Sequence, residues 1–335
     1  MEEIESKKTG RILIEAAIVL GILILSILAI NFIYEKTILE KKQIYIIEEE
    51  YLKYAQENNR TIKYAFFGDS HTNNDANPRY IPGAYNFAVG GQNYIKIYHR
   101  LNKILHKDKV KIDTIIFGVD PHTFSSKFYD DAFMLDNLWF WINYYKFYSY
   151  EELHKLTGKS KTQLFIDSRL PFLGQGRDFE ILFKNDRSMI YRGWIADNRN
   201  FSKENKTAVA KADYNANFRG QTTQLMEVGL LHFNKSINLA RENNMTIIFI
   251  RYPLSREYLD NLKYNNITQE EYYDIIFKII KDRLGSNYHF LDYQAIFMDN
   301  SEHYADSAHL NPGGSEEFSK RLYKDLVNLK NETIS

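Results

Sequence analysis

The chain has 335 residues, its 43 lysines and arginines are balanced by 43 aspartates and glutamates, and it contains no cysteine. This length suits one large domain or two small ones, at the usual ~100–200 residues per domain. The balanced charge gives no sign of a nucleic-acid partner, and the lack of cysteine excludes disulfides, zinc–thiolate sites and a thiol nucleophile.

An apolar run lies close to the N-terminus. Residues 1–11 are polar, and the nineteen residues Ala16–Tyr34 carry no charge. A helix needs about 20 residues to cross the hydrocarbon core of a bilayer. We therefore predict a short cytoplasmic tail (1–11) and a transmembrane signal anchor (12–34). A cleaved signal peptide is the alternative, although this run is longer than the ~7–15 residues of its apolar region and no small-x-small site follows.

Lysines flank this run on both sides, but long domains cross the membrane largely regardless of flanking charge. We expect a single-pass protein of the cell membrane whose larger part faces outside the cytoplasm. Residues 35–60 mix isoleucine and leucine with many charges. They predict a membrane-proximal amphipathic helix or linker.

The rest of the chain, residues 61–335, alternates apolar runs with longer amphipathic segments. The runs predict strands over residues 62–67, 84–89, 112–118, 245–251 and 288–292. The amphipathic segments predict helices over residues 93–107, 223–243, 268–283 and 313–329. Such alternation favours an α/β fold with three layers, in which helices cover both faces of a parallel sheet and ligands bind at the carboxyl ends of the strands.

A candidate nucleophile follows the first of these strands. The strand 62–67 ends at Gly68, and Asp69 and Ser70 come next. A serine hydroxyl needs a base within hydrogen-bond reach and N–H donors for the oxyanion. Near the C-terminus, Asp306 stands three residues before His309, close enough to orient the imidazole. We predict Ser70 as nucleophile, His309 as base and Asp306 as the residue that orients the base.

These motifs resemble those of the SGNH (GDSL-type) hydrolase superfamily. Gly68-Asp-Ser70 matches its first block, and Asp306-Ser-Ala-His309 matches its last. Asn86, followed five residues later by Gly91, has the spacing of the second block. The resemblance implies that the backbone N–H groups of Ser70 and Gly91 bind the oxyanion, with Gly90 as a substitute for Gly91.

The third block of that superfamily is Gly-x-Asn, and here Gly118-Val-Asp120 takes its place. The resemblance makes Asp120 a candidate oxyanion donor, but an ionised carboxylate would repel an oxyanion. Three alternatives follow: Asp120 is protonated, another group donates, or the oxyanion hole has only two backbone donors.

A long insertion, residues 121–222, separates the third and fourth strands. Its aromatic stretch 128–150 contains Trp139 and Trp141, which are candidates for substrate binding. The stretch is either a helical pair with its own small core, a lid, a platform for carbohydrate, or a patch on the membrane or a membrane partner. Residues 184–220 are polar and could shape a substrate groove.

Two further side chains are candidates for substrate binding. His71 follows the nucleophile and Arg251 leaves the fourth strand, where it suits an anionic group, although local hydrogen bonds and a structural ion pair are the alternatives. His303 and His309 would not share one face of a helix, so a metal site there is not expected. No cofactor is expected either.

An anchored domain with this layout resembles the accessory proteins of polysaccharide O-acetylation and of teichoic-acid D-alanylation. The resemblance implies acyl transfer, with O-acetyl transfer the expected case, to an exopolysaccharide or other cell-surface polymer through an acyl-serine. It also implies a multi-spanning membrane-bound O-acyltransferase as partner. The alternatives are a membrane-anchored carbohydrate esterase, and a catalytically silent binding or scaffold module, for which Asp120 is the motivating feature.

Overall fold

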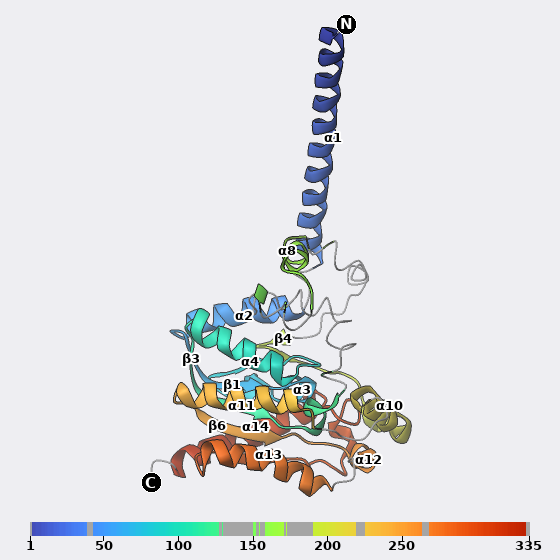
Figure 1. Ribbon diagram of the computed structural model, residues 1–335. Coiled ribbons are helices and arrows are strands. Elements are labelled where there is room, and N and C mark those ends of the chain that lie inside the picture. The colour runs from blue at the N-terminus through green and yellow to red at the C-terminus, as the bar shows by residue number, and fades with distance from the viewer. Residues whose placement is uncertain are drawn as a thin grey trace. The chain divides into compact units, whose positions relative to one another are not determined.

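The computed structural model describes residues 2–38, 43–126, 129, 150–151, 154, 158–170, 172, 190–218, 225–262 and 268–332 (Figure 1). The chain divides into two compact units. The first unit contains residues 1–46 and 137–186, and the second contains residues 47–136 and 187–335.

In the first unit, helix α1 (Glu2–Thr37) contains the predicted apolar run. Its part Gly10–Thr37 is 28 residues long, and its apolar window has a mean hydropathy of 2.8 and no buried residue. By length and composition it can cross a membrane. Near its end, Asn31 Nδ2 donates to the Arg169 carbonyl, at the end of α8 (Lys161–Arg169), and Tyr34 contacts the Phe172 ring.

The second unit is built on a five-stranded sheet. Its strands are β1 (Thr61–Phe67), β2 (Ala84–Asn86), β3 (Lys111–Gly118), β6 (Thr246–Arg251) and β7 (His289–Asp292). Their order is β2-β1-β3-β6-β7 and every neighbouring pair is parallel. The predicted parallel sheet is confirmed, and β2 is shorter than the sequence indicated.

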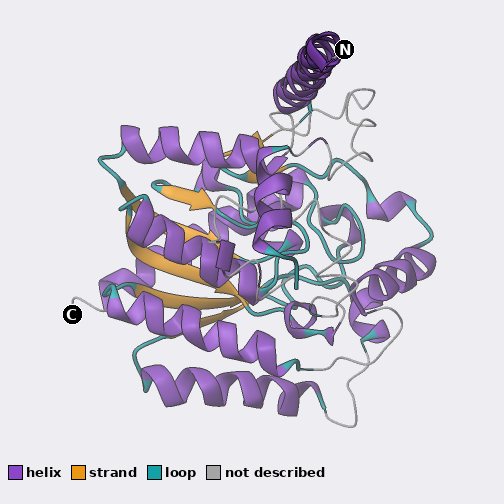
Figure 2. Cartoon of the chain, turned by 45° about the horizontal axis from the view of Figure 1, so that its top comes forward, coloured by secondary structure: helices purple, strands orange, loops and turns teal. Residues whose placement is uncertain are grey.

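Alternate strand residues point to opposite faces of the sheet, and both faces are covered by helices (Figure 2). One face packs against α14 (Pro312–Glu332). This core includes residues from three strands and the helix: Tyr64, Phe66, Ile116, Ile248, Ile250, Phe318, Leu322 and Leu326. The predicted three-layer α/β arrangement is therefore confirmed.

The other face is lined by phenylalanines, which stack from strand to strand. Phe117 lies 6.0 Å, centroid to centroid, from Phe249, which lies 5.7 Å from Phe233 of α11 (Glu227–Glu242). This face is completed by α4 (Tyr94–Asn102), which continues as a π-helical turn over Lys103–Lys107, and by α13 (Gln269–Leu284).

Of the remaining elements, α2 (Gln43–Glu57) lies within the segment 35–60, where the sequence predicts an amphipathic helix or linker, and the others are short or lie outside the predicted pattern. These others are α3 (Ser70–Asp75), the hairpin β4 (Ile190–Tyr191) and β5 (Trp194–Ile195), α10 (Lys206–Phe218), α12 (Arg256–Asn261), and 3₁₀ turns at Pro78–Tyr80, Pro121–Phe124, Phe201–Lys203 and Ser301–His303.

Candidate active site

Ser70 lies at a sharp strand-to-helix turn between β1 and α3. Gly68 is needed at this turn, because a Cβ there would lie 1.9 Å from Thr72 Oγ1. Asp69 caps the helix and accepts the His71 N–H at 3.1 Å. Ser70 is therefore the first residue of α3 and keeps part of its surface exposed beyond the carboxyl end of β1.

The structure brings Ser70, His309 and Asp306 into one hydrogen-bonded chain. Ser70 Oγ lies 2.8 Å from His309 Nε2. On the other side of the ring, His309 Nδ1 lies 2.9 Å from both carboxylate oxygens of Asp306. This arrangement lets the imidazole take the hydroxyl proton while the carboxylate fixes its tautomer.

The Asp306–His309 segment is a loop. A bridge between Tyr304 and Leu310 closes the loop, and the Asp306 carboxylate accepts the N–H groups of Ala308 and His309, each at 2.9 Å. Leu310 N–H donates to Asp75 Oδ1 at 2.8 Å. Because Asp75 ends the helix that Ser70 begins, this bond ties the nucleophile and the base together.

Burial and charge act in opposite directions on the pKa values of the pair. Burial alone would lower the pKa of His309, but the Asp306 carboxylate outweighs it, helped by Asp75 and Asp69, and raises that pKa to about 9. Burial alone would raise the pKa of Asp306, but His309 and the accepted N–H bonds hold it below its ordinary value. Asp306 therefore stays ionised and stabilises the imidazolium that forms when the ring takes a proton.

Two residues of the insertion, which the sequence did not single out, hold the same loop. Arg199 Nη2 donates to Asp306 Oδ2 at 2.6 Å, while its Nε donates to Asp197. Asp213 of α10 accepts from the N–H and the hydroxyl of Ser307, at 3.1 and 2.6 Å. Both contacts join segments about a hundred residues apart, so no local pattern could predict them.

Gly91 and Asp120, two of the predicted oxyanion donors, differ in where they lie relative to Ser70. Gly91 has a φ of +69°, which favours glycine, and a Cβ on Gly90 would lie 3.9 Å from Ser70 Cβ. The Gly90–Gly91 turn thus flanks the nucleophile.

Asp120 is completely buried. Its Oδ1 accepts the Tyr252 N–H at 3.4 Å, and its Oδ2 lies 3.4 Å from His71 Nδ1. Within the described residues, no hydrogen bond joins Asp120 to Ser70.

The candidates for substrate binding are not brought together. His71 is completely buried, and its ring lies 5.0 Å from that of His309. Burial, and then the neighbouring His122, lower the pKa of His71. Arg251 is paired with Asp292 and lies over the ring of Tyr273. Trp139 and Trp141 lie outside the described residues, as does most of the stretch 128–150.

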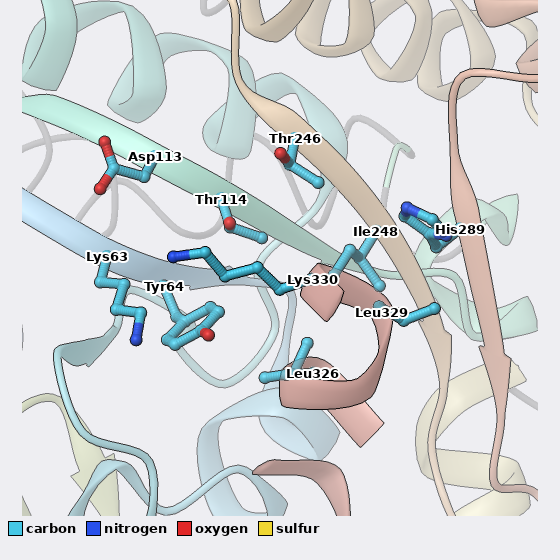
Figure 3. Close-up of a pocket in the computed structure, with 10 residues that line it drawn as sticks. All are labelled: Lys63, Tyr64, Asp113, Thr114, Thr246, Ile248, His289, Leu326, Leu329 and Lys330. Carbon is cyan, nitrogen blue, oxygen red and sulfur yellow. The ribbon is translucent and has the colours of Figure 1, made fainter. Parts of the chain in front are cut away.

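A cavity of about 510 Å³ lies at the opposite edge of the sheet (Figure 3). It is lined by residues near the amino ends of the strands, including Lys63, Thr114 and His289, together with Leu326 and Lys330 of α14. Since Ser70 follows the carboxyl end of β1, this cavity holds no part of the candidate site.

Comparisons with known proteins give only distant matches. No family model and no curated protein matches the chain. Among solved structures, a presumed acylhydrolase from Bacteroides fragilis is 10% identical, with a TM-score of 0.39 over 83% of this chain and 95% of its own. A GDSL-like lipase from Bacteroides thetaiotaomicron is 7% identical, with a TM-score of 0.40 over 86% of this chain and 100% of its own. At these scores the matches carry no statement on function, which has to come from the site itself.

Proposed function

We propose that this protein is a serine-dependent acyl-transfer enzyme of SGNH type, anchored in the membrane by α1. The observation that carries the proposal is the continuous chain from Ser70 Oγ through His309 to Asp306, with contacts of 2.8 and 2.9 Å. The turn between β1 and α3 supports it, because it leaves the hydroxyl partly exposed where an acyl donor can reach it.

The reaction begins with attack of Ser70 Oγ on the carbonyl carbon of an acyl ester. His309 Nε2 takes the hydroxyl proton as the new C–O bond forms, and the carbonyl oxygen becomes an oxyanion. The Asp306 carboxylate stabilises the imidazolium that results. When the tetrahedral intermediate collapses, the leaving alcohol takes the proton from His309, and the acyl group stays on Ser70.

The second half repeats these steps with an acceptor hydroxyl. His309 removes the proton of the acceptor, whose oxygen attacks the acyl-Ser70 carbonyl, and the proton then returns to Ser70 Oγ. The backbone N–H groups of Ser70 and Gly91 are the proposed donors to the oxyanion in both halves. With Asp120 turned toward His71 and Tyr252, the proposal uses only these two.

We further propose that the acceptor is a cell-surface polysaccharide or a teichoic-acid-like polymer, and that the acyl group is acetyl. The exposed apolar window of α1 supports work at a membrane. An extracytoplasmic domain of this kind would receive the acyl group from a multi-spanning membrane-bound O-acyltransferase.

Transfer and hydrolysis differ in what attacks acyl-Ser70, because water competes with every sugar hydroxyl. The full chain in detergent is incubated with an acetyl ester and an oligosaccharide, and the sugar is analysed by mass spectrometry. We expect slow hydrolysis alone and acetylated sugar when the right acceptor is present. Fast hydrolysis without acetylated sugar, across several surface polymers, would identify an esterase instead.

A further inference from the structure

The motif Asp-x-His occurs at the ends of two adjacent parallel strands. Asp69-Ser-His71 follows β1, and Asp120-Pro-His122 follows β3. The carboxyl ends of neighbouring parallel strands meet at one edge of the sheet. The two motifs therefore bring two carboxylates and two imidazoles together, and all four side chains are at most 1% exposed.

Three of these side chains point their donor atoms at one place. The candidate ligand atoms of Asp69, His71 and His122 all lie within 4.8 Å of one another. His122 Nε2 contacts Asp69 Oδ2, and the two imidazole centroids are 4.4 Å apart. Asp120 lies behind the group, with its Oδ2 3.4 Å from His71 Nδ1.

The cluster has unsatisfied polar atoms. Neither ring nitrogen of His71 makes a hydrogen bond, and Asp120 Oδ2 has no donor. A buried donor or acceptor without a partner lowers stability, so such atoms are rare in folded proteins. A ligand at this place would satisfy them.

The charges point to a cation. Two buried carboxylates need two positive charges, and two imidazolium rings with centroids 4.4 Å apart would repel each other strongly in a dry interior. One imidazolium would leave the cluster negative. A divalent ion with two neutral imidazoles balances both carboxylates.

We propose that Asp69, His71 and His122 bind one divalent transition-metal ion, with zinc as the most suitable. Two imidazoles and one carboxylate form a donor set that zinc uses in proteins, whereas Mg²⁺ and Ca²⁺ prefer oxygen ligands alone. Asp120 then accepts the proton of His71 Nδ1, which leaves Nε2 for the ion. This site is separate from the His303–His309 segment, where no metal was expected, and it does not rest on the proposed acyl transfer.

The position of the ion gives Asp120 a role. An aspartate stands where the resembled family has an asparagine donor, and in this protein it orients a metal ligand. Ser70 lies between two of the proposed ligands, Asp69 and His71, in sequence.

The test measures bound metal and does not depend on activity. The full-length Ser70→Ala protein is purified in detergent, stripped with a chelator, incubated with Zn²⁺ or Mg²⁺ and desalted, and its metal content is measured by mass spectrometry. We expect about one equivalent of zinc and no magnesium. His71→Ala and His122→Ala should lose the zinc, and Asp120→Asn should lower the affinity for zinc about 10–100-fold.

Two matched variants locate the ion. His106→Ala removes an exposed imidazole, and His309→Ala removes the imidazole of the candidate triad. Both should keep the zinc. The proposal is overturned if the stripped protein takes up no zinc, if His309→Ala loses it, or if the cluster variants keep it. Where His71→Ala does not fold, Asp120→Asn decides, and unchanged affinity in that variant would overturn the proposal.

Discussion

Asp75 connects the nucleophile to the base through a single buried carboxylate. Its Oδ1 accepts the Leu310 N–H at 2.8 Å, next to His309, while its Oδ2 has no partner. The backbone carbonyl of Asp75 accepts from Ser315 and Ser319 of α14. Burial, partly opposed by the Leu310 N–H, raises the pKa of Asp75 well above its ordinary value.

The raised pKa of Asp75 predicts that the protein becomes less stable as pH rises. The unfolded chain releases the Asp75 proton near pH 4, whereas the folded protein keeps it to higher pH. Across that window the unfolded state binds fewer protons, so the free energy of unfolding decreases as pH rises. In Asp75→Asn the side chain keeps an oxygen that can accept the Leu310 N–H, and it cannot ionise. The free energy of unfolding of this variant should therefore depend less on pH. Above this pH window it should exceed that of the unmutated protein by about 1 kcal/mol or more.

Thermal unfolding of both proteins from pH 4 to pH 8 checks this prediction. Asp299→Asn is the control, because Asp299 is exposed and its pKa is lowered through pairing with Arg256. That variant should leave the decrease with pH in place. Parallel curves for Asp75→Asn and the unmutated protein would show that Asp75 is not the cause.

Ser70 and His309 should act as one unit. Each substitution to alanine is expected to lower kcat/KM about 10³-fold or more, and the double variant should be no worse than either single variant. Steady-state hydrolysis of an acetyl ester by the three variants measures this, with Ser202→Ala as a control outside the chain of hydrogen bonds. If the loss of kcat/KM in the double variant equalled the product of the two single losses, the two residues would act independently.

At the scale of elements, part of the insertion supports the site. The hairpin β4–β5 packs against α3 and the end of β2. Asn73 Nδ2 donates to the Gly193 carbonyl at 2.7 Å, and Trp194 Nε1 donates to the Asn74 carbonyl at 2.6 Å. Asn86 N–H donates to the Arg192 carbonyl at 2.9 Å. These bonds fix the helix that begins with Ser70.

Gly193 is the residue on which this packing depends. It has a φ of +80°, and a Cβ there would lie 1.8 Å from the Asn86 carbonyl oxygen. Gly193→Ala should therefore lower stability by about 2 kcal/mol or more and reduce esterase activity. Gly285→Ala is the matched control, because its φ is +61° with nothing within 4 Å of the added Cβ. Equal losses of melting temperature in the two variants would contradict the role of the hairpin contact.

The elements that sequence could predict are those with a local signal. β1, β3 and β6 are apolar runs, and α14 begins with a proline and two glycines, so their positions follow from neighbouring residues. Helix α3 is six polar residues long and has no apolar period; the cap at Asp69 and long-range packing produce it. The two-residue strands of the hairpin carry no pattern at all.

The residues of the candidate site also divide into those with a local sequence signal and those without one. Ser70 and His309 stand in recognisable motifs, so their proximity could be expected from sequence. The contacts of Arg199 and Asp213 with the His309 loop depend on how the insertion folds back, which no local pattern encodes. The proximity of His71 to Asp120 joins motifs that follow two different strands, so neither motif alone predicts it.

At the scale of the molecule, α1 predicts where the protein works. The balanced flanking lysines set no orientation, and because long domains cross the membrane largely regardless of flanking charge, we expect residues 60–335 outside the cytoplasm. Protease added to intact spheroplasts should then degrade this part of the chain, and a cytoplasmic marker protein should stay intact. Protection of residues 60–335 until the membrane is permeabilised would reverse the orientation.

The central claim is that Ser70 becomes acylated with His309 as its base, and covalent labelling tests it most directly. The full chain is treated with a serine-directed fluorophosphonate and analysed by peptide mass spectrometry. We predict one adduct, on Ser70, that is lost in Ser70→Ala and strongly slowed in His309→Ala. Absence of labelling in the folded, unmutated protein, or labelling that survives Ser70→Ala, would contradict the claim and favour a silent module that kept the fold.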